Sequence, residues 1–338
     1  MTGRTGGDPE LGRSGRARAA PAVEPDAEPV PPTPPRAPLP LPPEGGFLVL
    51  DKPRGPSSHQ VTAWVRDLLG VTRAGHAGTL DPGVSGVLVI SVGKALRLLP
   101  LILEFPKRYI ASVRFHGPVG ASELEGIVKE FQGPIFQLPP VRSAVRRERR
   151  VRVVHKLTLL ERRGRDALLD IQCDSGTYIR TLAVDMGEAL GPGANMTELR
   201  RIGTGPFTET ESLTLSALAD LVAEAREGSP QPLLDRLQPI SRVWKRFPQV
   251  VVKDSAVDAL AHGADLAASG VLRTSSAFSE GQRVVLVTRK GELVGLGRAL
   301  LDSGKLLKSR KGWVVDAQQV FMETGRYAPH VREQPPKT

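Results

Sequence analysis

Short apolar runs with the periodicity of β-strands recur along residues 46–323 and alternate with stretches of helical periodicity. The run VLVISVG (87–93) predicts a buried strand, and KRYIASVRF (107–115) places alternate apolar residues on one face. DALLDIQC (166–173) predicts a further strand. Because the spacing is not that of regular βαβ units, the pattern favours a mixed α/β or α+β sheet domain over a doubly wound one.

Helices are predicted between these strands. Ser57 or Ser58 can cap the first of them. Its apolar stripe comprises Val61, Trp64, Val65 and Leu68. KALRLLPLILE (94–104) predicts a second helix, interrupted at Pro100. Residues 179–190 predict a third, which Thr177 can cap.

Composition divides the chain into four segments. Residues 1–45 hold twelve of the 30 prolines among Gly, Ala and Arg, which predicts a disordered tail. A large α+β domain is expected over 46–246. Short apolar runs separated by glycine turns predict a small β-barrel-like module over 247–323. Residues 324–338 are expected to form a flexible tail.

Positive charge is concentrated in one part of the chain. The formal net charge is +10, and residues 142–165 alone contain ten Arg or Lys against two Glu. Arginine dominates this window, which suits bidentate contacts with phosphate. The window and the small β module together indicate nucleic-acid binding, and a merely solvated basic hairpin is the alternative.

Several classes of protein are excluded by composition and motif. A single cysteine, Cys173, allows neither an internal disulfide framework nor a cysteine-rich zinc site. The six histidines lack metal-ligand spacing, and no glycine-rich dinucleotide or P-loop motif follows a strand. We therefore expect no metal and no cofactor. No apolar run of about 18 residues occurs, so we expect a soluble protein without a membrane span.

Four residues stand out as candidates for chemistry. Asp81 is the one carboxylate in GHAGTLDPGVSG (75–86), which contains four glycines. Either the segment is a set of tight turns, or its glycines let a bulky substrate approach the carboxylate. Tyr109 and Tyr178, two of the three tyrosines, begin a predicted strand and a predicted helix, and Arg180 follows Tyr178. Ordinary structural roles are the alternative for each of them.

Several stretches resemble one family, the TruB-type pseudouridine synthases. GHAGTLDPGVSGVL (75–88) is similar to the catalytic motif of that family, and FLVLDKPRGPSS (47–58) is similar to its first motif. The later motifs are matched in order by KRY (107–109), GTYIRTL (176–182) and ELRRIGTGPF (198–207). PPVRSAVRR (139–147) and the C-terminal module, which looks like a PUA domain, resemble the archaeal, dyskerin-like branch. That branch supplies the catalytic subunit of H/ACA RNA-guided particles. The resemblance implies an α+β fold, in which the catalytic domain has a mixed, antiparallel-rich sheet.

The resemblance implies roles for individual residues. Asp81 would be the nucleophile, Arg180 its ion-pair partner, and Tyr109 the residue that stacks on the uracil and takes part in proton removal. Tyr178 would line the pocket, and His76 would help to displace the flipped nucleotide. Other residues implied to support or contact substrate are Lys52, Pro53, Leu199, Arg146 and Arg147. The last two lie in a thumb-like basic region, about 137–156.

The function that this resemblance implies is isomerisation of uridine to pseudouridine in tRNA and, under an H/ACA guide, in rRNA. The implied partners are tRNA, rRNA, guide RNA and small accessory proteins, with a monomeric catalytic subunit. EGQRV (280–284) departs from the Gly-Asp that is more common in PUA domains, and the lysine-rich tails of nucleolar members are absent. The latter favours a cytoplasmic protein. A non-catalytic RNA-binding scaffold is the main alternative, and an RNA methyltransferase is a weaker one.

Overall fold

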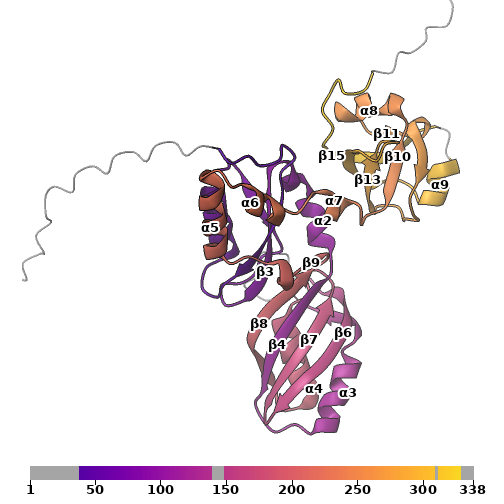
Figure 1. Ribbon diagram of the computed structural model, residues 1–338. Helices are drawn as coiled ribbons and strands as arrows, with labels where there is room; N and C mark the ends of the chain where they lie inside the picture. Colours follow the sequence, from indigo (N-terminus) through magenta and orange to yellow (C-terminus); the bar gives the residue numbers. More distant parts are fainter. Residues whose placement is uncertain (1–37, 139–147, 309–310, 329–338) are drawn as a thin grey trace, which may run out of the picture. The chain divides into compact units, whose positions relative to one another are not determined.

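The computed structural model describes residues 38–138, 148–308 and 311–328 of the chain (Figure 1). The larger of its two sheets contains nine strands, which are β1 (Gly46–Lys52), β2 (Ala74–Ala77), β3 (Ser85–Val92), β4 (Lys107–Phe115), β5 (Gly133–Gln137), β6 (Arg150–Arg163), β7 (Asp166–Cys173), β8 (Ala194–Thr204) and β9 (Phe207–Thr208). The spatial order is β1-β3-β8-β4-β7-β6-β5, with β2 beside β3 and β9 beside β8.

One pair of neighbouring strands in this sheet is parallel, and it joins two antiparallel halves. Strands β3 and β8 run parallel, and they share two paired positions, Ser85 with Arg200 and Gly86 with Arg201. The other pairings of the sheet within the described chain are antiparallel. The prediction of an α+β fold with a mixed, antiparallel-rich sheet is therefore confirmed. The parallel junction lies directly after the loop that carries Asp81.

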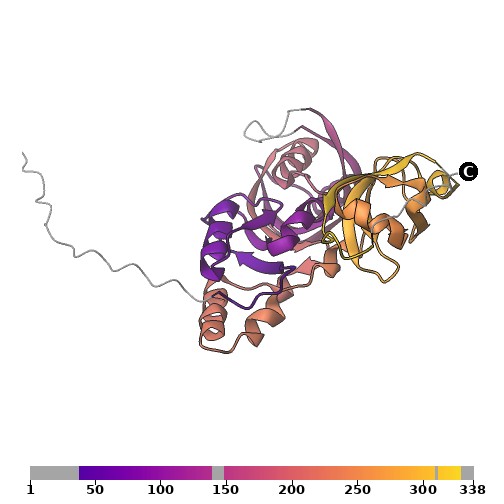
Figure 2. The same ribbon diagram turned by 90° about the horizontal axis from the view of Figure 1, so that it is seen from above.

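Helices cover each half of the sheet. They are α1 (Ser58–Leu69), α2 (Leu99–Glu104), α3 (Ala121–Glu130), α4 (Ile179–Leu190), α5 (Leu215–Arg226), α6 (Gln231–Arg236) and α7 (Ser241–Trp244). Helices α3 and α4 pack on the β4–β7–β6 part, around Phe115, Leu169 and Met186. In both views α5 and α6 lie beside the strands β1 and β3, where Leu218 and Leu233 join the core (Figures 1 and 2). The apolar faces of these helices therefore pack against both halves of the sheet.

The second sheet forms the C-terminal module. Its described strands are β10 (Gln249–Val252), β11 (Leu266–Ala267), β12 (Val271–Thr274), β13 (Arg283–Val287), β14 (Leu293–Ala299) and β15 (Trp313–Val320), with α8 (Asp254–Ala261) and α9 (Ser303–Lys308) beside them. The order β11-β15-β14-β13-β10-β12 curves into a barrel-like sheet. The β-barrel-like module predicted for this part of the chain is confirmed.

Two details of the predicted helices are wrong. Trp64 is 45% exposed, because the buried face of α1 is formed by Val61, Val65 and Leu69 instead. Thr177 does not cap α4, since its hydroxyl donates to the Asp174 carbonyl at 2.9 Å and leaves the helix terminus without a side-chain cap. Pro100 lies in the first turn of α2, which a 3-10 turn over Gly93–Leu98 precedes, so the predicted interruption is confirmed.

The cap of the first helix is confirmed at Ser57. The Ser57 hydroxyl accepts a hydrogen bond from the Gln60 amide at 3.2 Å, and the Gln60 side chain accepts one from the Ser57 amide at 2.8 Å. This reciprocal pair is a capping box, which satisfies two N–H groups at the helix terminus. Ser58, the alternative cap, is buried and bonds the loop that carries Asp81.

Packed contacts extend past the predicted ends of the two domains. Leu39 and Leu41, in the segment before β1, pack partly buried against the core of β1 and β3. Near the C-terminus, the Tyr327 hydroxyl donates to Glu292 at 2.5 Å. Residues 1–37 and 329–338 lie outside the described residues. No helix in the described part of the chain is long and apolar enough to cross a membrane.

Candidate active site

The loop that carries Asp81 is held at alternate carbonyl groups. The Arg201 guanidinium donates to the Gly78 carbonyl at 2.8 Å. Ser58 accepts from the Leu80 amide at 2.8 Å and donates to the Leu80 carbonyl at 2.9 Å. The Pro82 carbonyl accepts from the Gly55 amide at 2.8 Å. Because these groups come from two other parts of the chain, residues 55–58 and β8, the position of Asp81 is fixed by the folded chain rather than by the loop alone.

Most of the glycines in this loop are explained by the backbone conformation and the packing of the loop itself. Gly78 and Gly86 have positive φ angles of 72° and 103°. A Cβ atom at Gly86 would lie 2.2 Å from the Arg201 carbonyl oxygen, and one at Gly75 would lie 2.9 Å from two leucine side chains. Gly83 faces open space. Close approach of a substrate therefore explains at most Gly83, whereas the other three glycines are required by turns and packing.

Asp81 and Arg180 form an ion pair at the surface. An Arg180 Nη atom lies 3.1 Å from Oδ2 of Asp81, and the two side chains are 60% and 62% exposed. The prediction that this arginine pairs with Asp81 is confirmed in geometry, but the carboxylate is open to solvent rather than buried. An exposed pair of this kind contributes little to stability, since solvent screens it. An accessible, oriented carboxylate is therefore the main consequence of the pair.

Tyr109 lies near this pair on β4. Its side chain is partly buried and packs against the core of the β4–β7 half of the sheet. Burial raises the pKa of the Tyr109 phenol above its ordinary value, and the Asp81 carboxylate adds to the rise, whereas the Arg201 guanidinium opposes it. The phenol is therefore neutral at physiological pH, which makes it a hydrogen-bond donor rather than a free base.

Tyr178 and Leu199 lie on neighbouring elements. Tyr178 is the residue before α4, and its backbone amide and carbonyl bond the Gln137 side chain at 2.9 and 3.0 Å. Leu199 pairs with Ala111 across β8 and β4, and it packs partly buried in the same core as Tyr109. Gln137, at the end of β5, is a residue that sequence reasoning missed, because a lone glutamine carries no motif.

Lys52 and Pro53 lie directly beneath the loop. The Lys52 side chain is fully buried, and its ammonium group donates to the Pro53 carbonyl at 2.7 Å and faces the Pro82 carbonyl at 3.5 Å. Burial lowers the pKa of Lys52, and the Asp81 charge opposes this change. These hydrogen bonds agree with the prediction that Lys52 and Pro53 support the catalytic loop. Arg146 and Arg147 lie outside the described residues.

His76 is held as a neutral imidazole of one tautomer. The Thr62 hydroxyl donates its proton to the Ser58 carbonyl at 2.7 Å, so it accepts from Nδ1 of His76, which is 2.8 Å away. Nδ1 therefore carries the proton, and Nε2 accepts from the Thr79 hydroxyl at 3.3 Å. Burial first, then the nearby His59 and Arg201, lowers the pKa of His76 to about 4.

This shift predicts a pH dependence of stability. Between pH 6.5 and about 4 the unfolded chain binds a proton at residue 76 that the folded chain does not, so the free energy of unfolding falls as the pH falls. His76→Gln removes this contribution. We expect the stability advantage of the native chain over His76→Gln, measured by urea unfolding, to be smaller at pH 5 than at pH 7. An equal difference at both pH values would contradict the assignment.

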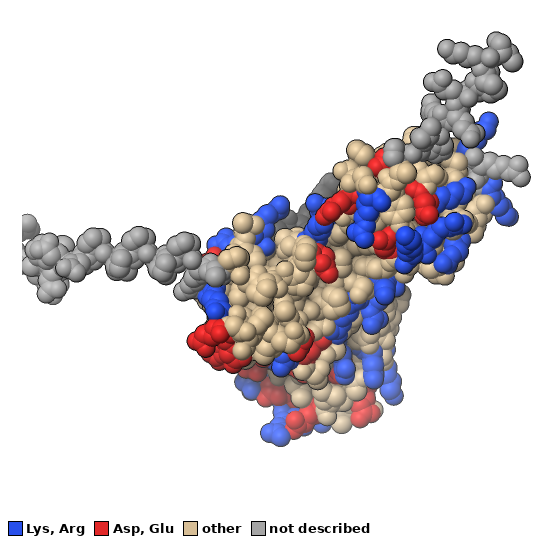
Figure 3. All heavy atoms as spheres, turned by 45° about the horizontal axis from the view of Figure 1, so that its top comes forward, with Lys and Arg blue, Asp and Glu red and all other residues tan. Residues whose placement is uncertain are grey.

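Basic side chains extend from the site along the sheet. The described cations of the basic window include Arg150, Arg152 and Lys156 on β6. The Arg152 guanidinium lies 3.2 Å from the position that a Cβ atom would take at Gly176, two residues before Tyr178. Figure 3 shows Lys and Arg side chains spread over one face of the described chain, between smaller groups of Asp and Glu. In this view the Lys and Arg side chains gather toward the right, over the C-terminal module, and that part of the face would attract a polyanion.

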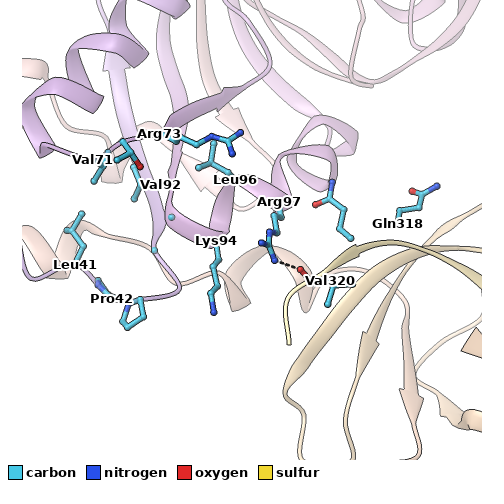
Figure 4. Close-up of a pocket in the computed structure, with 15 residues that line it drawn as sticks. Leu41, Pro42, Val71, Arg73, Val92, Lys94, Leu96, Arg97, Gln318 and Val320 are labelled. Carbon is cyan, nitrogen blue, oxygen red and sulfur yellow. Dashed lines mark hydrogen bonds between the residues drawn. The ribbon is translucent and has the colours of Figure 1, made fainter. Parts of the chain in front are cut away.

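A pocket of about 950 Å³ lies elsewhere (Figure 4). Its lining includes Leu41, Arg73, Lys94 and Arg97, and the Arg97 guanidinium donates to the Val320 carbonyl. None of the predicted site residues lines this pocket. Within the described residues, no three His, Cys, Asp or Glu side chains are grouped as metal ligands. The Asp81 side chain is 62% exposed, so the candidate site lies at the surface of the described chain.

Three family profiles match successive parts of the chain. Residues 66–126 match the N-terminal domain of TruB family pseudouridylate synthases. Residues 180–244 match the C-terminal domain of tRNA pseudouridylate synthase B, and residues 248–321 match the PUA domain.

Relatives with known names span most of the chain. A probable tRNA pseudouridine synthase B of Pyrobaculum arsenaticum is 49% identical over 282 residues, which cover 83% of this chain and 85% of the relative. The protein of that name from Methanothermobacter thermautotrophicus is 44% identical, with 83% and 87% covered.

Solved structures agree with these relatives. A chain of a Cbf5-Nop10-Gar1 complex superposes with a TM-score of 0.78 at 43% identity, covering 82% of this chain and 85% of that one. A chain of an H/ACA RNP bound to a substrate RNA that contains 2′-deoxyuridine gives a TM-score of 0.75 at 40% identity, with 86% and 89% covered. The similarity therefore includes both sheets of the described chain.

Proposed function

The chain belongs to the TruB family of pseudouridine synthases, and from this we propose that it isomerises uridine to pseudouridine in the T loop of tRNA. The observation that carries the proposal is the ion pair between Asp81 and Arg180, 3.1 Å apart and accessible to a macromolecule. Asp81 lies on a loop that residues 55–58 and β8 hold in place, near the neutral phenol of Tyr109. The names of the relatives support tRNA as a substrate.

The reaction constrains what the site must do. Isomerisation breaks the C–N glycosidic bond and forms a C–C bond between the same base and ribose, with no net oxidation or reduction. The uridine must leave its stack, at a cost of a few kcal/mol, and its base must rotate while it remains bound. A flat aromatic face such as that of Tyr109 can hold the detached base by stacking.

Asp81 has three possible roles in this chemistry. The carboxylate can attack C1′ of the ribose, attack C6 of the uracil, or support removal of a ribose proton in a glycal route. In each case Arg180 keeps the carboxylate ionised and directed. In the first two routes a covalent adduct forms and breaks, so Asp81 is regenerated at the end of each cycle.

A second mode of action follows from the structural relatives. We propose that the chain also acts on rRNA, as the catalytic subunit of an H/ACA particle with a guide RNA and small accessory proteins. The similarity to chains in a Cbf5-Nop10-Gar1 complex and in an H/ACA RNP with substrate RNA supports this mode. The matched PUA domain supports RNA binding by the C-terminal module. A monomeric catalytic subunit and a cytoplasmic location remain predictions.

A reconstitution assay tests both modes. Purified protein is incubated with an unmodified tRNA transcript, and separately with an rRNA fragment, a matching guide RNA and accessory proteins. Pseudouridine is then mapped by primer extension after chemical derivatisation. We expect modification of the T-loop uridine by the protein alone, and of the rRNA uridine only when guide and accessory proteins are present.

The controls separate an enzyme from an RNA-binding scaffold. Asp81→Asn should bind the same RNAs and modify neither. If the native protein binds RNA tightly but forms no pseudouridine in any arm, the catalytic proposal is wrong and the scaffold alternative stands. Modification that is unaffected by Asp81→Asn would instead mean that a different carboxylate is responsible.

A further inference from the structure

Gln137 is a buried polar residue to which no step of the proposed reaction assigns a role. It ends β5, where it pairs with Arg150 of β6, and it is 2% exposed. Burying a carboxamide costs free energy unless its oxygen and its NH₂ group form hydrogen bonds. Both groups of Gln137 bond a single residue, Tyr178, so this side chain joins β5 to the residue before α4.

The two hydrogen bonds act on the backbone of Tyr178. The Tyr178 amide donates to Oε1 of Gln137 at 2.9 Å, and Nε2 of Gln137 donates to the Tyr178 carbonyl at 3.0 Å. Because a backbone N–H only donates and a C=O only accepts, the pair admits one orientation of the carboxamide. The same carbonyl accepts the first hydrogen bond of α4, from the Leu182 amide at 3.0 Å. Gln137 therefore holds the peptide groups on both sides of Tyr178 where the helix starts.

The turn before this point is tied to the sheet as well. The Asp174 amide donates to the Val153 carbonyl at 2.9 Å, and the Val153 amide donates to Oδ2 of Asp174 at 3.1 Å. The chain is thus fixed to β6 at Asp174 and to β5 at Tyr178, four residues later. The second of these anchors is a side chain 41 positions away along the sequence, and it sets how the chain enters α4.

Arg180 lies in the first turn of the helix whose start is held in this way. It follows Tyr178 by two residues, and its guanidinium lies 3.1 Å from Oδ2 of Asp81. The Arg180 side chain is 60% exposed, so its direction depends on the backbone from which it projects. Misplacement of a group in an active site by about 1 Å can slow a reaction by about 100-fold. A change at Gln137 would therefore reach the Asp81–Arg180 pair through the backbone of this turn.

We propose that Gln137 is a positioning residue, which fixes the backbone of Tyr178 and, through it, the approach of Arg180 to Asp81. The proposal rests on the pseudouridine synthase activity proposed above. Gln137 does not touch the substrate in this account, since it is buried. A residue that only stabilised the packing of α4 would affect the rate equally with or without Arg180. A residue that acts through Arg180 loses its effect when Arg180 is absent.

Thr214 provides a matched control. Its hydroxyl accepts a hydrogen bond from the Ala217 amide at 3.1 Å, at the start of α5. Both α4 and α5 contain 12 residues, and α5 carries none of the candidate site residues. Thr214→Val therefore removes a side-chain hydrogen bond at the start of a helix, as Gln137→Met does, without acting on Arg180.

The experiment is a double-mutant cycle on single-turnover pseudouridine formation in a tRNA transcript. Gln137→Met is expected to slow the reaction by about 10-fold, with RNA affinity within about threefold of native. Because Gln137 acts through Arg180, adding Gln137→Met to Arg180→Ala should slow the reaction further by less than about twofold. Thr214→Val should leave the rate unchanged in both backgrounds.

Each outcome of the cycle decides one proposal. When the native protein is active, an unchanged rate in Gln137→Met overturns the positioning role and leaves the proposed function in place. An equal loss in the native and Arg180→Ala backgrounds has the same consequence, because Gln137 would then not act through Arg180. No turnover by the native protein overturns the proposed function, and the role of Gln137 falls with it.

Amide hydrogen exchange tests the contact without turnover. Amides at the start of a helix have no intrahelical acceptor. Because the Tyr178 amide donates to a buried oxygen, NMR of the native protein should show its exchange slowed by at least about 100-fold relative to an unstructured chain. Gln137→Met should remove this protection, and Thr214→Val should not. A Tyr178 amide that is unprotected in the native protein overturns the proposal, even if Gln137→Met does not fold.

Discussion

Asp81→Asn is expected to slow pseudouridine formation by at least about 1,000-fold and to leave RNA affinity within about threefold of native. The exchange is almost isosteric, so the shape of the loop is kept. It removes the negative charge that every route considered for this reaction requires. The expected change in the free energy of unfolding is small, because the pair with Arg180 is exposed. Single-turnover kinetics and filter binding on one tRNA transcript measure the two quantities.

Asp67→Asn is a matched control for this variant. The Asp67 side chain is 63% exposed, against 62% for Asp81, and it also pairs with an arginine, Arg66, at 2.7 Å. It lies on α1, outside the candidate site. We expect native turnover from it. Retained activity in Asp81→Asn, or an equal loss in both variants, would contradict the assignment of Asp81 as the reacting carboxylate.

Arg180→Ala is expected to slow turnover by about 100-fold, with a smaller loss of RNA affinity. Without the guanidinium, the carboxylate of Asp81 loses the partner that directs it. Arg180→Lys should recover part of the rate, since the charge remains but the planar donor group is lost. Rate and dissociation constant are measured on the same transcript.

Arg54→Ala provides the comparison. Arg54 is 58% exposed and pairs with Glu198 at 2.9 Å, so it matches Arg180 in exposure and in kind of partner. Its removal should not change the single-turnover rate. If Arg180→Ala lost affinity and rate by the same factor, Arg180 would be a phosphate contact and not the orienting partner of Asp81.

The sequence predicts the elements that have strong periodicity. Strands β3, β4 and β7 follow their apolar patterns, because one or both faces of each are buried in the core. The pairing of Asp81 with Arg180 was also predictable, but from motif resemblance, since 99 positions separate them along the chain. Periodicity alone cannot indicate a contact between distant segments.

Other features depend on tertiary contacts that no local pattern reveals. The burial of Arg201 could not be predicted from composition, because arginine is a surface residue in most settings. The stretch that could have indicated this burial is ELRRIGTGPF, in which two adjacent arginines occupy a strand. Strand alternation sends them to opposite faces, and Arg200 pairs with Asp51 at 2.8 Å while Arg201 enters the core. Trp64 shows the converse, an apolar residue that tertiary packing leaves exposed.

A structure of Asp81→Asn bound to an RNA with the target uridine would test the central claim most directly. The quantity of interest is the distance from the residue 81 side chain to C1′ and C6 of that uridine. We expect a flipped uridine whose base stacks on Tyr109, with one of these carbons about 3–3.5 Å from the carboxamide, the separation of reacting atoms in a near-attack geometry. A uridine that stays in its helical stack, or a base bound away from residue 81, would contradict the account.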